Sequence, residues 1–248
     1  MQKEIIFLGS KPVGYHCLAH LIQQQEALDY TITGVLTNDN PVFSQALSLR
    51  QLAAQHGIPV IDSPEALPAC DILYSVQYHR ILQQQHIAQA RQRAVNLHMA
   101  PLPEYRGCNQ FSFAILDEAA MFGTTIHTMD ARIDHGDILF ENRFAIPENC
   151  WVNDLYQLTY EASLRLFTES LAAIVANEVH PVPQQQLLAS RPSSLHFRNE
   201  INAVKQIDLA WPAAKIERHI RATYMPGFEP PYTLINGTKV YFDPQPQA

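Results

Sequence analysis

The sequence contains few charged residues, and the acidic ones outnumber the basic ones. Among its 248 residues, 17 are Lys or Arg and 24 are Asp or Glu, which gives a formal net charge of −7. Proteins held to nucleic acid through phosphate contacts usually carry a basic face. Because nothing in this charge balance suggests such a face, we expect no nucleic-acid partner.

Cysteine is also scarce, and long apolar runs are absent. The four cysteines, at positions 17, 70, 108 and 150, form no Cys-x-x-Cys pair, so neither a zinc site nor a disulfide framework is expected. No apolar run approaches the roughly 18 residues needed to span a bilayer. The opening stretch MQKEIIFLGS is too short and too soon interrupted for the apolar part of a signal peptide. We therefore expect a cytoplasmic protein with reduced thiols, no metal and no membrane partner.

The first half of the chain alternates strand and helix patterns. Apolar residues make up 47% of the chain, enough for a substantial core. Strands are predicted at Glu4–Leu8, Thr31–Thr37, Ile58–Ile61, Asp71–Val76 and Ala94–His98, and helices at Val13–Gln24, Ser44–His56 and Gln84–Ala94. This alternation predicts an α/β fold with a Rossmann-like, doubly wound, mostly parallel sheet.

The second half predicts a hairpin, a long helix and a small C-terminal unit. The predicted elements are a helix at Asn109–Asp117, a strand pair at Gly123–Met129 and Asp137–Ile146, a helix at Asn153–Asn177, a linker at His180–Ser194, a helix at Ala213–Ala222 and a hairpin at Tyr232–Phe242. Asn236-Gly237 is a strong type I′ turn signal. We expect a catalytic domain over residues 1–190 and a small α+β hairpin subdomain over 195–248. The glutamine triplets, including Gln184–Gln186, are interpreted as solvated surface.

The stretch VNLHMAPLPEYRG places two polar side chains at the end of an apolar strand. Asn96 and His98 lie two residues apart and therefore share one face of that strand. Ligands of open parallel sheets bind beyond the carboxyl ends of the strands. Histidine moves protons near neutral pH, and an amide donates a hydrogen bond to a developing oxyanion. The alternative is a structural histidine beside a turn-forming asparagine.

A second polar cluster lies in HTMDARIDHGDILF, residues 127–140. Asp130, Asp134 and Asp137 crowd one loop, where carboxylates bind metal, raise one another's pKa or simply form turns. Asp130 and Asp137 fit the turn role better. Asp134, at the loop tip, is the better chemical candidate, and His127 is expected in the core of the hairpin.

Together, the two stretches resemble the catalytic domain of folate-dependent formyltransferases. The shared pattern is Asn-x-His, a Leu-Pro-x-Tyr-Arg-Gly loop, and then His-x-Met-Asp-x-x-x-Asp-x-Gly-Asp-Ile. The resemblance covers residues 5–171 and is strongest over 95–139. It implies transfer of a formyl group from N10-formyltetrahydrofolate to an amine, without a metal. Asn96, His98 and Asp134 match the catalytic residues of the family.

The resemblance also implies where the folate would bind. The pterin would lie near YSVQYHRIL, held largely by main-chain groups, and near the Asp134 loop. The positions implied are Tyr74, Val76, Gln77, Tyr78, Ile81 and Leu82, together with Asp130 and Asp137.

The short C-terminal tail bears on the acceptor. It resembles the aromatic hairpin of sugar-nucleotide N-formyltransferases, which implies a nucleotide-linked amino-deoxysugar of surface-polysaccharide (for example O-antigen) biosynthesis and a homodimer. The predicted substrate-binding residues are Ser10, Lys11, Arg106 and Tyr224, with Arg198, Lys205 and Arg221 as further candidates. Arg106 fits a substrate-side or a loop-ordering role, and a local salt bridge fits it equally well. Tyr224 also fits the packing of the hairpin.

Three other functions remain open. A methionyl-tRNA formyltransferase-like enzyme uses the same chemistry on a different amine. A formyltetrahydrofolate hydrolase uses water and needs no acceptor pocket. A catalytically silent folate- or nucleotide-binding module is the third, although an intact Asn96, His98 and Asp134 set speaks against it.

Overall fold

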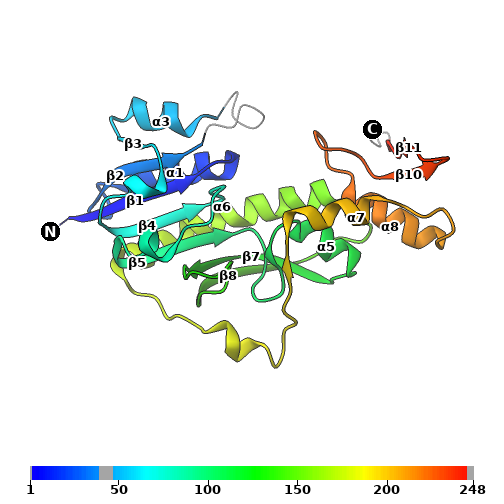
Figure 1. The fold of residues 1–248 in the computed structure, drawn as a ribbon. Helices are drawn as coiled ribbons and strands as arrows, with labels where there is room; N and C mark the ends of the chain where they lie inside the picture. Colours follow the sequence, from blue (N-terminus) through cyan, green and yellow to red (C-terminus); the bar gives the residue numbers. More distant parts are fainter. Residues whose placement is uncertain (1, 39–46, 245–248) are drawn as a thin grey trace.

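A single seven-stranded sheet forms the centre of the computed structural model, which describes residues 2–38 and 47–244. The strand order is β3-β2-β1-β4-β5-β7-β8, and Figure 1 shows the strands with the helices around them. The strands are β1 (Lys3–Gly9), β2 (Tyr30–Thr37), β3 (Val60–Ile61), β4 (Cys70–Val76), β5 (Ala90–His98), β7 (Met121–Thr128) and β8 (Ile138–Ala145).

The sheet is parallel from β3 to β5 and antiparallel from there to β8. The predicted doubly wound α/β fold and the predicted β7–β8 hairpin are therefore confirmed. Because β1, β4 and β5 run in the same direction, their carboxyl ends meet at one edge. The order of connections reverses between β1 and β4, which is the position where open α/β sheets bind ligands.

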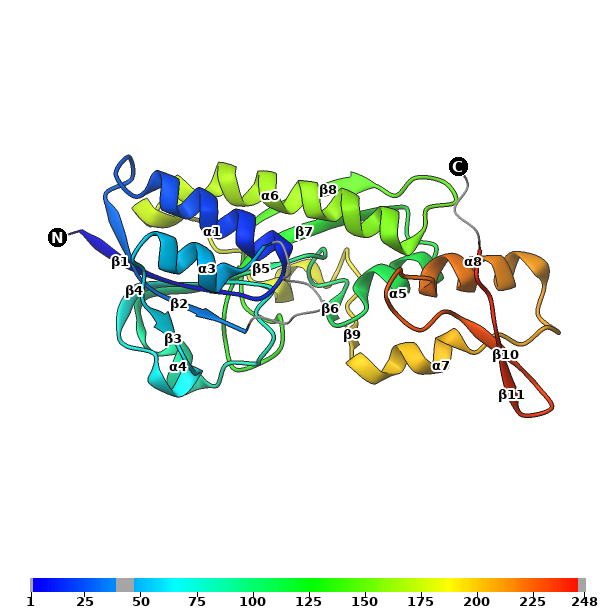
Figure 2. The same ribbon diagram turned by 90° about the horizontal axis from the view of Figure 1, so that it is seen from above.

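Alternating side chains along β1 divide the core into two layers. Ile5 and Phe7 point to one face, and Ile6 and Leu8 point to the other. Helices α1 (Pro12–Gln24), α3 (Leu49–Gln55) and α6 (Val152–Ala176) cover the first face, and Figure 2 shows α1 and α6 side by side over the sheet. The second face packs against α4 (Gln84–Ile87) and the loops around it.

The predicted helix over 84–94 is wrong beyond its first turn. Helix α4 ends at Ile87, and β5 begins at Ala90, four residues before the predicted start of that strand. Arg91 of β5 forms ion pairs with Asp71 of the adjacent strand β4 at 3.0 Å and with Glu4 of β1, the next strand of the sheet, at 2.5 Å. Strand pairing and these tertiary contacts outweigh the local helical preference of the segment.

The predicted helix at Ser44–His56 is confirmed only in its later part. Helix α3 begins at Leu49, where the Ser48 hydroxyl accepts a hydrogen bond from the Gln51 amide at 3.1 Å and so caps the helix. Residues 44–46 of the prediction lie outside the described residues.

The C-terminal elements lie at the end of the molecule farthest from the N-terminus (Figures 1 and 2). They are α7 (Ile201–Lys205), α8 (Ala213–Thr223), β10 (Tyr232–Ile235) and β11 (Thr238–Tyr241). Helix α8 packs on α5 (Gln110–Leu116), where Ala222 is buried with Ala114 and Ile115. Both turn residues of the hairpin, Asn236 and Gly237, have positive φ, so the predicted hairpin is confirmed. Helix α7 was not predicted.

The predicted linker is attached to the first part of the chain at two places. Val182 pairs with Ile138 at the start of β8, and the short strand β9 (Leu195–His196) pairs with β6 (Arg106–Gly107). Neither pairing was predicted, because two-residue strands leave no periodic signal. The linker therefore reaches both loops that carry the candidate site.

Among the described residues, no helix has both the length and the apolar character needed to cross a membrane.

Candidate active site

Strand β5 delivers Asn96 and His98 to the carboxyl edge of the sheet, as the alternation predicts. His98 is buried, and its Nε2 lies 2.7 Å from the Tyr105 carbonyl oxygen. A carbonyl only accepts hydrogen bonds, so Nε2 carries the proton in the neutral ring. Nδ1 is then the basic nitrogen, and it faces Asp134 Oδ2 at 3.6 Å.

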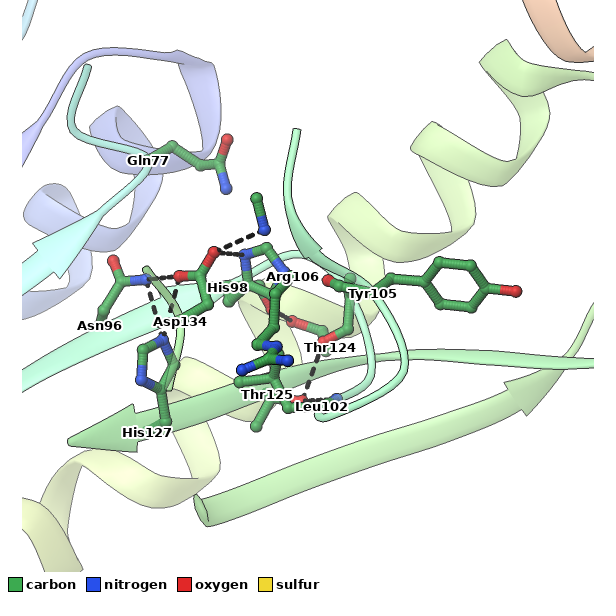
Figure 3. A network of polar contacts seen from close by, with 12 residues as sticks. Gln77, Asn96, His98, Leu102, Tyr105, Arg106, Thr124, Thr125, His127 and Asp134 are labelled. Carbon is green, nitrogen blue, oxygen red and sulfur yellow. Dashed lines mark hydrogen bonds and ion pairs between the residues drawn. The ribbon is translucent and has the colours of Figure 1, made fainter. Parts of the chain in front are cut away.

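Asp134 lies in the loop between β7 and β8, with a φ of 46°. Its Oδ1 lies 3.5 Å from Asn96 Nδ2, and its Oδ2 accepts a hydrogen bond from the Gly107 amide at 3.0 Å. Figure 3 shows Asn96, His98 and Asp134 pointing toward one another. The structure therefore brings together the three residues predicted to be catalytic.

His127 belongs to the same cluster, although only a hairpin-core position was expected. It stands opposite Asn96 in the antiparallel register of β5 and β7. Its Nδ1 lies 2.7 Å from the Thr128 carbonyl, so Nε2 faces Asn96 Nδ2 at 3.2 Å and Asp134 Oδ1 at 3.4 Å. The signal was present in the alternation, since Ile126 points into the core and its neighbour must face the other way.

The carboxylate of Asp134 is held in its charged form. Burial by itself raises the pKa of Asp134, but the nearby rings of His98 and His127 and the hydrogen bond from the Gly107 amide together bring the pKa well below its usual range. An ionised carboxylate between two imidazoles stabilises either ring when that ring gains a proton.

Only glycine fits at position 107. Its φ is 85°, and a Cβ there would lie 2.2 Å from the carbonyl oxygen of His196. This close approach lets the Gly107 amide reach Asp134 while the neighbouring chain of β9 packs against it.

The residues predicted to hold folate divide into buried and accessible ones. The side chains of Tyr74, Val76 and Leu82 are in the core, so they cannot contact a ligand except through their main chain. The implied main-chain contacts remain open to them. Tyr74 and Val76 share the core face of β4 because side chains alternate along a strand. Gln77 has a φ of 53° and extends toward the cluster of Asn96, His98 and Asp134 (Figure 3). Ile81 is 71% exposed.

The remaining folate candidates show mixed environments. Tyr78 is partly buried against the second core layer. The Asp130 carboxylate accepts hydrogen bonds from the Arg132 amide at 2.8 Å and from His135 at 3.0 Å, which fits the turn role. Asp137 contributes its carbonyl to the Thr128 amide at 2.9 Å, closing the loop that carries Asp134.

Of the predicted substrate residues, Ser10 and Lys11 lie at the sheet edge. Ser10 Oγ is 3.2 Å from His79 Nδ1, and Lys11 Nζ donates to Gln77 Oε1 at 3.0 Å, which joins the ends of β1 and β4. Desolvation lowers the pKa of both Lys11 and His79, and the positive charge of Arg198 acts in the same direction on both. Arg198 is therefore close enough for its charge to act on Lys11, although the two residues are far apart in the sequence.

The other two predicted substrate residues have partners within the protein. Arg106 donates to Ser193 Oγ at 2.8 Å and to the Ser194 carbonyl at 3.3 Å, which supports its loop-ordering alternative. Tyr224 binds Asp243 Oδ1 at 2.8 Å and packs edge-on against Trp151. The two contacts of Tyr224 lie within the C-terminal part of the chain and at its junction with the start of α6.

No group of three His, Cys, Asp or Glu side chains within residues 2–38 and 47–244 is arranged to hold a metal ion.

Comparison with known proteins identifies the family. The formyl transferase family model matches residues 31–171. A methionyl-tRNA formyltransferase of Roseiflexus sp. is 31% identical over 90% of this chain and 70% of its own length. A GDP-perosamine N-formyltransferase of Brucella melitensis is 26% identical over 70% of this chain and 64% of its own length.

The same fold occurs in an N-formyltransferase from Helicobacter canadensis, whose crystal structure is a complex with folinic acid and dTDP-3-aminofucose. The two structures match over 97% of this chain and 86% of the Helicobacter canadensis chain, with 26% sequence identity and a TM-score of 0.78. The site, the family model and these relatives agree, and the chain belongs to the formyl transferase family.

Proposed function

We propose that this protein transfers a formyl group from N10-formyltetrahydrofolate to the amine of a nucleotide-linked amino-deoxysugar. The observation that carries this proposal is the convergence of the Asn96 amide, the basic nitrogen of His98 and the ionised Asp134 at the carboxyl edge of β5. A base, a hydrogen-bond donor and a charge that stabilises the protonated base are what acyl transfer to an amine requires.

In the proposed mechanism, the sugar amine attacks the formyl carbon and forms the new C–N bond. The resulting oxyanion accepts a hydrogen bond from Asn96, whose contact to Asp134 at 3.5 Å is long enough to be replaced. His98 Nδ1 takes the amine proton, and Asp134 stabilises the imidazolium and orients a water that assists proton transfer. The oxyanion then re-forms the carbonyl as the bond to N10 breaks, and the proton held by His98 passes to N10, which returns His98 to its neutral form.

The donor is proposed to bind beside the end of β4. Ile81 is large and apolar yet mostly exposed, which suits a residue that contacts a flat ring system. Gln77, which directly follows β4, points toward Asn96 and Asp134 (Figure 3). The folinic acid complex of the Helicobacter canadensis relative supports a reduced folate as the donor.

The acceptor is proposed to be a dTDP-linked 4-amino-4,6-dideoxyglucose or a 3-amino isomer in O-antigen or other surface-polysaccharide biosynthesis. The relatives that act on or bind nucleotide sugars support this class. Lys11 and Arg198 offer positive charge for a diphosphate. The methionyl-tRNA formyltransferase relative favours a second candidate, a tRNA acceptor, whereas the net charge of −7 disfavours it.

A panel of acceptors tests the proposal. The donor is mixed with the protein and dTDP-, GDP- or UDP-linked 3-amino and 4-amino sugars, initiator methionyl-tRNA, or no acceptor, and tetrahydrofolate release is followed. Turnover with one class of amino sugar is expected. Turnover with tRNA alone would identify the second candidate, and equal release without acceptor would identify a hydrolase.

His127 is proposed to keep Asn96 in place. Replacing His127 by Phe removes the acceptor for the Asn96 amide at 3.2 Å, so kcat for formyl transfer is expected to fall about tenfold to 100-fold, less than for loss of a group that handles the proton. Steady-state kinetics check this value. His127→Asn, which keeps a polar partner, should retain more activity than His127→Phe, and the reverse order would contradict the role.

A homodimer through the C-terminal hairpin is proposed because its apolar side chains are exposed. These are Leu234, Ile235, Val240 and Tyr241, each 45–50% exposed. Replacing Val240 by Asp should convert a dimer to a monomer in sedimentation velocity, because burial of a charge opposes association. Thr238→Asp, at the exposed turn end of the same strand, should change the sedimentation coefficient less. A monomeric wild-type protein would contradict this assembly.

A further inference from the structure

One of three consecutive glutamines in the predicted linker is buried against the catalytic loop. Gln184 is 5% exposed, whereas Gln185 and Gln186 in the same short turn are exposed. The expectation that this triplet is solvated surface is therefore wrong for its first member. A polar side chain buried in this way must have partners that justify its desolvation.

The partners of Gln184 are main-chain groups of the catalytic loop. Its Nε2 donates to the carbonyl oxygen of Asp134 at 2.9 Å and to that of Gly136 at 2.8 Å. Two carbonyls require two hydrogens, and the amide nitrogen has two. The orientation of the amide is therefore fixed, because the reverse orientation would place its own oxygen against both carbonyls. Its oxygen is buried without a hydrogen-bond partner among the described residues.

This contact acts on the residue whose carboxylate faces both histidines. Asp134 has a φ of 46°, a conformation that is uncommon for residues other than glycine. Its side chain contacts Asn96, His98 and His127, while its main chain is held by Gln184. Its contacts to these three side chains, at 3.4–3.6 Å, are longer than the 3.0 Å hydrogen bond that its carboxylate accepts from the Gly107 amide. The side chains of the cluster therefore do not define the position of the loop by themselves.

The same segment also holds the second loop of the site. Arg191 donates to the Leu102 carbonyl at 3.2 Å and pairs with Glu141 at 2.7 and 2.9 Å. Ser194 Oγ donates to the Glu104 carbonyl at 2.6 Å. The loop held in this way includes the carbonyl that fixes the tautomer of His98 and the amide that binds Asp134. Residues 184–194 thus contact both loops of the site, and Gln184 is the residue of this segment that binds the main chain of Asp134.

We propose that Gln184 is a positioning residue, which holds the Asp134 carboxylate in place between His98 and His127 through its two hydrogen bonds to the loop backbone. For its effect on turnover, the role rests on the formyl transfer proposed above. A displacement of about 1 Å in such a group lowers the rate of a catalysed reaction by about 100-fold, so a residue that acts only through the backbone still has a large effect.

The test compares Gln184→Met with Gln185→Met. Methionine keeps the length and volume of the side chain and removes both donors, and Gln185 is the exposed neighbour in the same turn. The first readout is the pKa of Asp134, from carbon-13 NMR of its carboxyl group. The second is kcat and KM for formyl transfer. We expect the pKa of Asp134 to rise toward its usual value and kcat to fall about tenfold to 100-fold in Gln184→Met, with neither change in Gln185→Met.

An unchanged Asp134 titration in folded Gln184→Met would overturn the proposal, and so would an equal change in both variants. Should Gln184→Met fail to fold, Gln184→Asn keeps the amide but is one methylene too short to reach both carbonyls, and the same shift in titration is expected. The titration needs no acceptor. If the wild-type protein formylated no amine, the proposed function would fail while the NMR result still decided the positioning role.

Discussion

Replacing His98 by Gln is expected to lower kcat for formyl transfer by about 10²- to 10⁴-fold, because the basic Nδ1 that takes the amine proton is lost. The tautomer of His98 determines which nitrogen is lost. Nε2 is committed to the Tyr105 carbonyl at 2.7 Å, so only Nδ1 is available for proton transfer. Steady-state kinetics with saturating donor and acceptor measure the loss, and KM for the donor should change by less than about threefold, since the binding surface at β4 is untouched.

His180→Gln is the matched control for this variant. His180 is exposed in the segment after α6 and lies outside the cluster, so its replacement should leave kcat unchanged. A His98→Gln variant that is folded and turns over within a factor of three of the wild type would remove His98 from the mechanism.

Replacing Asp134 by Asn should have an effect of similar size, about 10²- to 10⁴-fold on kcat. The amide has almost the shape of the carboxylate but carries no charge, so the imidazolium formed at His98 loses its neighbouring anion at 3.6 Å. The new amide also has an NH2 group, which cannot accept a hydrogen bond. If this group takes the place of Oδ2, the 3.0 Å hydrogen bond from the Gly107 amide is lost. Rapid-quench measurement of a single turnover checks that the chemical step is the one slowed.

The pH dependence of stability provides a separate check on Asp134. Its pKa is lower in the folded protein than the value of about 3.9 usual for the unfolded chain. A carboxylate of this kind stabilises the folded state above about pH 4, and this contribution is lost as the pH falls toward its folded pKa. The difference in Tm between wild type and Asp134→Asn should therefore shrink below about pH 4. A difference that grows on acidification would contradict the direction of the shift.

The control for the effect of Asp134→Asn on kcat is Asp208→Asn, which changes an exposed carboxylate in a loop. Asp208 caps the Ala210 amide at 2.8 Å in the C-terminal part of the chain, distant in sequence from the site. Asp208→Asn should leave kcat unchanged.

The sequence predicts the parts of the site that obey short periodicities. Asn96 and His98 share a face because side chains alternate along a strand, and the structure confirms their meeting with Asp134. His127 follows from the same alternation only when the register of β5 and β7 is known. That register depends on the turn and on the core partners, which no pattern within one strand specifies.

Contacts between distant segments are what the sequence does not predict. Gln184 reaches the Asp134 loop across 50 residues, and the two other glutamines of its triplet remain exposed. From the composition of the segment, all three glutamines are expected to be exposed to solvent. Only the packing of the turn buries Gln184 and leaves the other two exposed. The early start of β5 has the same origin, because Arg91 is held by acidic residues of β1 and β4.

The destination of the formyl carbon tests the central claim most directly. The wild-type protein is incubated with N10-formyltetrahydrofolate labelled with carbon-13 in the formyl group and with dTDP-linked 3-amino and 4-amino sugars, and the product is examined by NMR. We predict a labelled formamide on the sugar amine, formed by the wild type and lost in His98→Gln. Labelled formate with no formamide on any amino sugar would contradict the proposed transfer.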